Sequence, residues 1–485
     1  MITAKQSAKA HVKAMKEKEE METNNSLPDL SKYDFSGENM SPSDMDPVLR
    51  AQIVEDVATV LTAIQQDHSR RFIEREEQSY LCWLTLVANA NAVLLGPPGT
   101  SKSQLVRTLF DYLEDAKEFH LTCHPATRPE DLFGGIDIPS MRDGVWRNLT
   151  EDALPGAECG FLDEIFKTNP GTLTSLLEIM EPEDRRFKGG KVSTSAVFGA
   201  SNETPRGLDR GDALLAPLWD RFLIRFHCEP IKSELGWTRM MFDGKPVKSK
   251  DIPKLKLAHI RFLQQCKTEV IIPDVVQDSI VQLRGVLLSE KIVLSDRRWA
   301  QLVRMILPAV ALMDGRMYCE VNDLERLAAC IWDIAPGSER AKVDPILTQI
   351  ASPTATELIT YCQKAEELLD QLLMLDRQEK DLQASAPTLP AEKVAQARTE
   401  LVQQRGQKHT LVVNTMVALK AAISEEEASI AVTGKKLIGQ KLARHVKAKD
   451  LMQRLEMTRQ AAIAATTSRL ESMRTHQLGR VRTTT

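Results

Sequence analysis

The sequence lacks the features of a secreted or membrane-spanning protein. No apolar run approaches the length that crosses a bilayer, and residues 1–22 carry charge where a signal peptide needs an apolar stretch. The eight cysteines are scattered without a Cys-x-x-Cys pair, and Cys82 and Cys330 lie in apolar stretches, as small core residues do. The formal net charge of -4 gives no overall bias toward nucleic acid or membranes. We therefore expect a cytoplasmic protein in a reducing compartment, without a membrane span.

The length and the apolar content suit several packed domains. The chain has 485 residues, and 42% of them are hydrophobic. Along the chain we predict a flexible N-terminal segment, an α/β domain, an all-helical domain, a helical or coiled-coil arm and a flexible tail. Their expected boundaries are 1–46, 47–229, 230–340, 354–476 and 477–485.

Short apolar runs alternate with helical patterns in the α/β segment, which predicts a parallel sheet covered by helices. The expected strands are Ala92–Leu95, Phe119–Thr122, Gly160–Leu162 and Ala196–Ala200, and the expected helices between them are Lys102–Glu114 and Thr172–Met180. After Glu229 helical patterns dominate, including one over Asp296–Met313. In the arm, apolar residues step by four and three from Tyr361 to Leu382, and a second such seam starts at Val412, which indicates helix pairing.

A candidate phosphate-binding loop follows the first expected strand and opens a helix. It consists of Gly96, Pro97, Pro98, Gly99, Thr100, Ser101, Lys102, Ser103 and Gln104. Backbone N–H groups at such a helix start point at an anion, Lys102 would reach the β- and γ-phosphates of ATP, and Ser103 would ligate Mg²⁺. Ser101 stands where the usual pattern has Gly; it would be strained at positive φ and accepted in a right-handed helical conformation. The alternative is a generic Gly-Pro turn before a helix.

Polar side chains end the next buried strands. Asp163 and Glu164 follow an apolar strand 61 residues after Lys102. Asp163 would hold the Mg²⁺ shell, and Glu164 would orient or deprotonate the attacking water. Asn202 ends another strand and would hydrogen-bond the water or the γ-phosphate, unless it only forms a turn. Because open α/β sheets bind ligands at one edge of their strand ends, these residues are expected to meet the phosphate loop.

Two arginines complete the candidate site. Arg221 precedes an apolar run and is a candidate arginine finger, which places positive charge on the γ-phosphate in the transition state. Arg297 opens a helix of the all-helical segment and is expected to close that segment onto the nucleotide. Each also fits a surface or ion-paired structural role, and Arg210, Arg225 and Arg298 compete for these positions.

In this order the motifs resemble the MoxR family of AAA+ ATPases, and within it the RavA-like branch. The similarity spans residues 47 to about 335. Members of this family resemble this chain in having a small residue, here Ser101, before the lysine of the phosphate loop. Besides the phosphate loop the similarity rests on 127–134 (TRPEDLFG), 160–167 (GFLDEIFK, similar to Walker B), 185–187 (RRF), 200–203 (ASNE, similar to sensor 1), 218–221 (LWDR, the finger region) and 295–299 (SDRRW, similar to sensor 2).

The resemblance implies an AAA+ P-loop αβα subdomain with an all-helical lid, followed by a long α-helical C-terminal region. It also implies Mg-ATP hydrolysis by a homo-oligomer, a hexameric ring with sites between subunits, which remodels a protein client in the manner of a chaperone. The resemblance further implies a protein partner with a von Willebrand factor A domain. Family inserts would fall near Asp131–Arg147 and Glu183–Ser195. RavA-like members carry a small β-rich domain in the arm, whereas residues 354–476 show helices without a convincing strand set.

The end of the chain is basic. Residues 435–482 contain twelve Lys or Arg and three acids. Such a segment can bind nucleic acid, but it holds no aromatic residue to stack a base, and a solvated helix face is the favoured interpretation. We expect this tail to be dispensable for hydrolysis.

Two other functions compete with protein remodelling. One is a nucleic-acid motor, although no recognisable helix-turn-helix, zinc motif or OB-like strand series supports it. The other is a nucleotide-gated scaffold that recruits partners through the arm. Intact Lys102, Asp163, Glu164 and Asn202 argue against lost catalysis.

Overall fold

The computed structural model describes residues 27–33, 35, 41–202, 216–242, 254–331, 340–351, 355–385, 390–433 and 447–462. The chain divides into two compact units. The first comprises Met1–Pro230, Pro246–Val276 and Leu294–Ala335, and the second comprises Ile231–Lys245, Gln277–Val293 and Pro336–Thr485. Most of the predicted N-terminal flexible segment, the tail at 477–485 and Arg210 lie outside the described residues.

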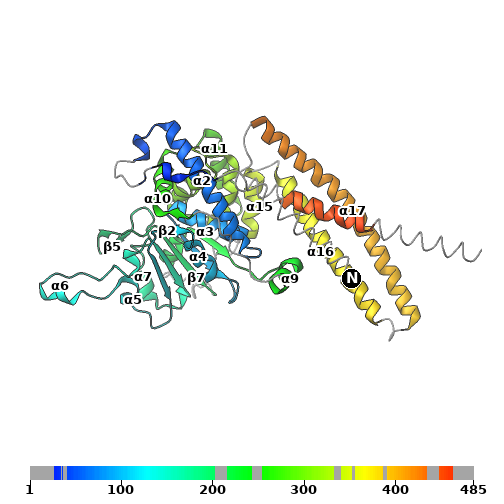
Figure 1. Cartoon of the computed structure of the whole chain (residues 1–485), viewed down its shortest axis with the longest axis horizontal. Helices are drawn as coiled ribbons and strands as arrows, with labels where there is room; N and C mark the ends of the chain where they lie inside the picture. The colour runs from blue at the N-terminus through cyan, green and yellow to red at the C-terminus, as the bar shows by residue number, and fades with distance from the viewer. Residues whose placement is uncertain are drawn as a thin grey trace, which may run out of the picture. The chain divides into compact units, whose positions relative to one another are not determined.

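A five-stranded parallel sheet organises the first unit (Figure 1). Its strands are β1 (Asn91–Leu95), β3 (Glu118–Thr122), β4 (Cys159–Asp163), β7 (Ala196–Ser201) and β8 (Ile224–His227), in the spatial order β3-β4-β7-β1-β8. The four expected strands are confirmed. Every residue of β1 and β7 is buried, as in strands covered on both faces. The strand β8 was not expected, because Arg225 and His227 interrupt its short apolar run; it pairs with β1.

Helices and short connecting elements surround this sheet. They are η1 (Leu30–Lys32), η2 (Pro42–Asp44), α2 (Pro47–Arg70), α3 (Glu76–Ala88), α4 (Lys102–Phe110), β2 (Leu113–Glu114), α5 (Pro129–Phe133), η3 (Leu154–Gly156), η4 (Ile165–Lys167), α7 (Pro170–Thr174), α8 (Ala216–Arg221) and β9 (Leu255–Lys256). Two expected helices were too long. Helix α4 ends at Phe110, and β2 beyond it pairs with β9.

The second shortened helix is α7. It was expected to reach Met180 but ends at Thr174, and turns follow. Arg185 Nη1 donates to the Ile179 carbonyl at 2.9 Å, and Asn91 Nδ2 donates to the Met180 carbonyl at 2.8 Å. Arg185 and Asn91, the latter on a distant strand, thus hold the backbone of the turns that follow α7.

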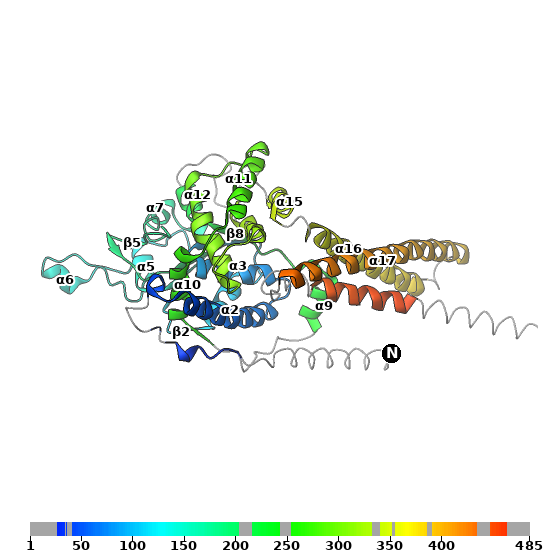
Figure 2. The ribbon, with the colours of Figure 1, turned by 90° about the horizontal axis from the view of Figure 1, so that it is seen from above.

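The two expected insert positions carry added structure. Helix α6 (Ile138–Arg142) extends away from the sheet in both ribbon views (Figures 1 and 2), and an isolated bridge between Ile136 and Asn148 closes its base. Ile138 and Trp146 of this segment are 61% and 70% exposed. The second position is a hairpin in which β5 (Arg186–Phe187) pairs with β6 (Gly190–Lys191).

The remainder of the first unit is helical. It contains α10 (Leu257–Cys266), η6 (Lys267–Glu269), α12 (Asp296–Gln301), η7 (Leu302–Ile306), α13 (Leu307–Met313), η8 (Val321–Leu327) and α14 (Ala328–Ile331). The expected helix Asp296–Met313 is confirmed, with a π-helical turn at η7. Pro308 follows this turn and has no N–H for the carbonyl four residues earlier, which accounts for the wider turn. All seven residues of α13 are buried.

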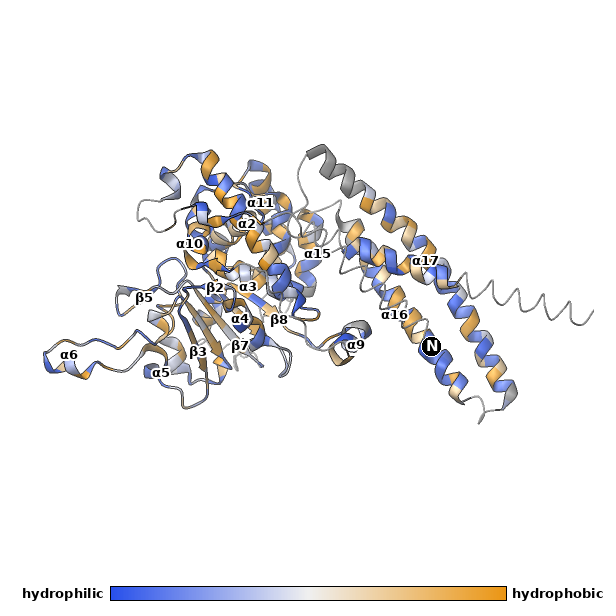
Figure 3. Cartoon of the chain, viewed as in Figure 1, coloured by the Kyte–Doolittle hydropathy of each residue, from blue (hydrophilic) through white to orange (hydrophobic). Residues whose placement is uncertain are grey.

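The described elements of the second unit are all helices. Its helices are α9 (Glu234–Phe242), most of α11 (Asp274–Ser289), α15 (Arg340–Ala351), α16 (Ala355–Ser385), α17 (Ala391–Thr433) and a helix over 447–462. Apolar and polar residues alternate along α16 and α17 (Figure 3), and the two helices pack on each other as predicted. Ala448, Leu451 and Leu455 of the last helix join the same apolar core. Part of the basic tail is therefore an integral helix of this bundle.

The described residues include no helix that combines the length and hydrophobicity of a membrane span. All eight cysteines are buried and unpaired with one another, so Cys82 and Cys330 are core residues as predicted.

Candidate active site

The phosphate loop lies between the end of β1 and the start of α4, as predicted. A Cβ on Gly96, whose φ is +146°, would lie 2.2 Å from the Cys228 carbonyl oxygen, so the close approach to the end of β8 requires glycine. Ser101 caps α4 with φ 64° and ψ 20°. Of the two conformations considered for Ser101, the strained left-handed one is therefore present, at a cost of about 1–2 kcal/mol. Such strain is typical of functional sites.

Lys102 folds back over the loop that precedes it. Its Nζ donates to the carbonyl oxygens of Gly96 and Pro97 and to Asn202 Oδ1, each at 2.8 Å. Lys102 is only 6% exposed, and desolvation lowers the pKa of its ammonium group. Neutral oxygens thus satisfy its three N–H donors, and a phosphate anion would be a stronger partner for the same charge.

Ser103 and Asp163 join the first turn of α4 to the end of β4. Ser103 Oγ donates to Asp163 Oδ2 at 2.6 Å. The other carboxylate oxygen of Asp163 accepts a hydrogen bond from the backbone N–H of Glu164 at 3.0 Å, which orients the group. A hydroxyl beside a carboxylate is a donor set that suits Mg²⁺, which keeps several waters and takes few protein oxygens.

Asn202 connects the phosphate loop to Glu164. Its Oδ1 accepts from Lys102, and its Nδ2 donates to Glu164 Oε1 at 2.5 Å. Glu164 has φ 55° and ψ 34°, a second left-handed residue within the site. Among the described residues Glu164 Oε2 is buried without a hydrogen-bond partner, while Lys167 Nζ lies 3.3 Å away. This carboxylate oxygen thus keeps capacity to accept a hydrogen bond beside the Lys167 ammonium group.

The two predicted arginines lie at the other end of β1. Asn91, the first residue of β1, donates through Nδ2 to the Arg221 carbonyl at 3.1 Å, whereas the phosphate loop follows the last residue. A five-residue strand spans about 16 Å. Arg297 Nη2 contacts both oxygens of Glu181, at 2.6 and 2.7 Å, and Arg221 Nη2 lies 3.6 Å from the same carboxylate. The structure therefore places Arg297 beside Arg221, not beside Lys102 of its own chain.

The competing arginines have structural surroundings. Arg225 is 1% exposed, lies over the Trp219 ring and donates to backbone carbonyls of α8 and the following turn. Arg298 is 4% exposed and donates to the carbonyls of Cys330 and Leu223. Because both guanidinium groups are enclosed by their own chain, neither can reach a nucleotide held by another subunit.

Two residues of this region, Glu181 and Asn91, escaped the sequence analysis. Glu181 lies in a turn-rich acidic stretch that has the composition of a solvated surface. In the sequence Asn91 resembles the polar first residue of a strand, but in the structure its side chain is fully buried. An amide directly before an entirely apolar run was the one available signal, because a buried amide needs hydrogen-bond partners.

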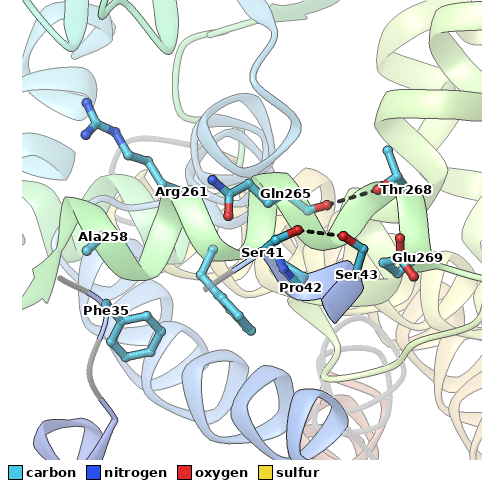
Figure 4. A pocket seen from close by; sticks show the side chains of 10 residues that line it. Phe35, Ser41, Pro42, Ser43, Ala258, Arg261, Gln265, Thr268 and Glu269 are labelled. Atoms are coloured by element: carbon cyan, nitrogen blue, oxygen red, sulfur yellow. Dashed lines mark hydrogen bonds between the residues drawn. The ribbon is translucent and has the colours of Figure 1, made fainter. Parts of the chain in front are cut away.

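A cavity of about 500 Å³ lies away from these residues (Figure 4). It is lined by Phe35, Ser41, Pro42, Ser43, Ala258, Arg261, Phe262, Gln265, Thr268 and Glu269. None of the predicted site residues borders it, so this cavity is separate from the candidate site at the strand ends.

Comparisons with known proteins indicate the family. Residues 59–265 match a family model described as the MoxR domain in the MoxR-vWA-beta-propeller ternary systems, and residues 275–347 match an AAA lid domain. The chain is 30% identical to the uncharacterized protein MJ0079 of Methanocaldococcus jannaschii over 321 residues, which cover 65% of this chain and 81% of that protein. MJ0812 of the same organism is 30% identical over 319 residues, with the same two coverages.

Two weaker similarities accompany these. The structural protein ORF618 of Acidianus two-tailed virus is 25% identical over 178 residues, 36% of this chain and 28% of that protein. The crystal structure of a candidate ATPase from Cytophaga hutchinsonii superposes with a TM-score of 0.47 at 16% identity, over 61% of this chain and 96% of that one.

Proposed function

We propose that this chain, which belongs to the MoxR family of AAA+ proteins, hydrolyses Mg-ATP in a ring and uses the energy to remodel a protein partner. One observation carries the proposal: Asn202 bridges Lys102 to Glu164 while Ser103 is bonded to Asp163. A phosphate anchor, a metal-type ligand pair and a base thus meet at one edge of the sheet, where α/β proteins bind ligands.

Each of these residues has a defined task in hydrolysis. Lys102 exchanges its neutral oxygen partners for the β- and γ-phosphates of ATP. Asn202 is then able to hydrogen-bond the γ-phosphate or the water. Glu164 Oε2 orients the water and takes its proton as the water oxygen attacks the γ-phosphorus in line, while the bond between that phosphorus and the bridging oxygen of ADP breaks.

Ser103 and Asp163 are the residues that would hold Mg²⁺. Bound there, the ion would neutralise charge that develops on the phosphate oxygens. The Ser103–Asp163 hydrogen bond keeps both oxygens together for this purpose.

The place of Arg221 supports the proposal of a ring. Its backbone is tied to the start of β1, at the end opposite to the phosphate loop, so it cannot serve the nucleotide of its own chain. We therefore place it, with Arg297, against the γ-phosphate of a neighbouring subunit, in a hexamer with sites between subunits. A finger supplied in this way raises the rate by about 10³–10⁵.

The proposed partner is a protein with a von Willebrand factor A domain. The matching family model is described for systems that include such a protein. The exposed Ile138 and Trp146 on the projecting α6 segment supply apolar surface of the kind that contacts a protein partner or client. Membership of the RavA-like branch stays a prediction; the described residues beyond 340 form helices only, without the small β-rich domain.

Nucleic-acid translocation is less well supported. The helix over 447–462 uses Leu451 and Leu455 to pack against α16 and α17, and Lys447 pairs with Glu366 at 3.0 Å. This part of the basic tail is a bundle helix with a solvated basic face, which the composition already favoured.

The variant Glu164→Gln tests hydrolysis. It should bind Mg-ATP with unchanged affinity and release phosphate at least about a hundredfold more slowly, because the water loses its base. Binding titration and phosphate release are measured beside Glu151→Gln, a matched change at an exposed glutamate in a turn, which should turn over normally. Normal turnover by Glu164→Gln would refute the assignment. Adding a purified von Willebrand factor A domain partner to the wild type should change the rate; a partner without any binding or effect contradicts that part of the proposal.

A further inference from the structure

The arginine end of the sheet is held by a buried polar network. Asn91 is fully buried, and its Nδ2 donates both to the Met180 carbonyl and to the Arg221 carbonyl, at 2.8 and 3.1 Å. Its Oδ1 accepts from Arg185 Nη1 at 2.8 Å. One amide therefore fixes the backbone of Arg221 and that of the residue just before Glu181.

Arg185 adds hydrogen bonds to this network, and the acceptors are neutral oxygens. Its guanidinium is buried and donates to the carbonyls of Ile179, Asn89, Ala90 and Ser195. A buried charge is tolerated only when it is well hydrogen-bonded, so the turn that carries Glu181 is held closely against the start of β1.

Within this network Glu181 contacts both Arg221 and Arg297. Arg297 Nη2 contacts both of its oxygens, and Arg221 Nη2 lies 3.6 Å from Oε2. Arg221 is further anchored through Nε to the Leu177 carbonyl at 3.0 Å and through Nη1 to the Pro217 carbonyl at 2.9 Å. Asp220 Oδ2 lies 3.9 Å from Arg297 Nη1. Two like charges would separate without an anion between them, and Glu181 is the group that both share.

We propose that Glu181 is a positioning residue that holds Arg221 and Arg297 side by side, so that they meet a neighbouring subunit's γ-phosphate as one unit. This rests on the proposed function. Each guanidinium has five N–H donors, and the contacts named above engage fewer, so a phosphate can bind both groups while Glu181 stays in place. Glu181 acts through the arginines and does not touch ATP.

The variant Glu181→Gln tests this role. It keeps the size of the side chain but removes the charge, so both arginines lose their common anchor. We expect the kcat of ATP hydrolysis to fall about 10- to 100-fold with little change in KM, because a small misplacement of a catalytic group costs rate and the phosphate loop of the same chain is untouched. The control is Asp184→Asn, an exposed neighbouring acid paired with Arg186, which should leave the rate unchanged.

Mixing experiments separate positioning from a general structural defect. When Glu181→Gln chains are mixed with an excess of Lys102→Ala chains, the intact phosphate loops face neighbours with an intact arginine pair, and the rate per Glu181→Gln chain should recover. Recovery cannot occur if the damage lies within the chain that binds ATP. A double variant Glu181→Gln/Arg297→Gln should lose less than the sum of the two single losses, expressed as activation free energies, because both changes break the same Glu181–Arg297 contact.

Distinct results overturn the two proposals. If the wild type hydrolyses ATP and Glu181→Gln matches its kcat, or mixing restores nothing under subunit exchange, or the double variant shows additive losses, the positioning role is wrong while the ATPase stands. If the wild type itself hydrolyses no ATP, the proposed function fails first.

Discussion

Two residues of the candidate site, Ser101 and Glu164, have a left-handed backbone conformation. Ser101 has φ 64° where the usual loop has glycine, and Glu164 has φ 55° at the base position. A left-handed serine costs about 1–2 kcal/mol relative to the right-handed conformation. Both residues flank the contacts of Lys102 and Asp163, so the strain lies where backbone direction decides the site.

We predict that Ser101→Gly stabilises the protein and keeps nucleotide binding. Glycine removes the left-handed strain but adds freedom to the unfolded chain, so the net rise in the free energy of unfolding should be about 0.5–1 kcal/mol. Denaturant unfolding measures it, with Ser101→Ala as the control that keeps the strain and should not stabilise. A loss of stability in Ser101→Gly would show that the serine side chain, not its φ, matters.

The helices of the arm form an apolar core of their own. The seams predicted along α16 and α17 pack together, and the helix over 447–462 completes their apolar core. The expectation that the tail is dispensable therefore concerns hydrolysis only, since its removal after Thr433 uncovers apolar side chains such as Leu419 and Ile423.

We predict that Leu451→Ala loosens this bundle without affecting hydrolysis. Leu451 is 1% exposed, and truncating a buried leucine costs about 2–5 kcal/mol. Limited proteolysis should cut within residues 447–462 sooner than in the wild type, while phosphate release stays normal. Met457→Ala, at a 53% exposed position of the same helix, is the matched control and should resist as the wild type does. If proteolysis of Leu451→Ala is as slow as that of the wild type, the packing of this helix against α16 and α17 is contradicted.

At the scale of the whole molecule, the site is divided between two ends of one sheet. The phosphate anchor follows β1, and the arginines lie at its start. Under the proposed function a single chain presents half of a site at each end, and assembly would complete one.

We predict that Arg221→Ala and Lys102→Ala chains, each inactive alone, recover part of the hydrolysis when mixed. Some interfaces then pair an intact phosphate loop with an intact finger, whose contribution is about 10³–10⁵ in rate. Phosphate release after subunit exchange measures the recovery, and wild-type activity should fall steeply on dilution below the assembly threshold. A dilute monomer that hydrolyses ATP at the full rate, or a mixture that stays inactive, would leave Arg221 with a structural role.

The sequence by itself determined the phosphate loop, four of the five strands and the meeting of Asn202 with Lys102 and Glu164. These follow from local patterns and from one topological rule, because the carboxyl ends of parallel strands share an edge wherever each strand lies in the chain. The fifth strand was missed because charged residues hide its burial, which Arg225 achieves only by lying over Trp219 and donating to carbonyls.

Only the tertiary structure decided the conformation of Ser101, the early end of α7 and the pairing of Arg297 with Arg221 through Glu181. In the turns that follow α7, Asn91 of β1 holds the Met180 carbonyl across 89 residues of chain. Glu181 and Arg297 lie 116 residues apart. A local pattern cannot encode such an ion pair, because its energy comes from geometry that exists only after both segments have packed on the same sheet.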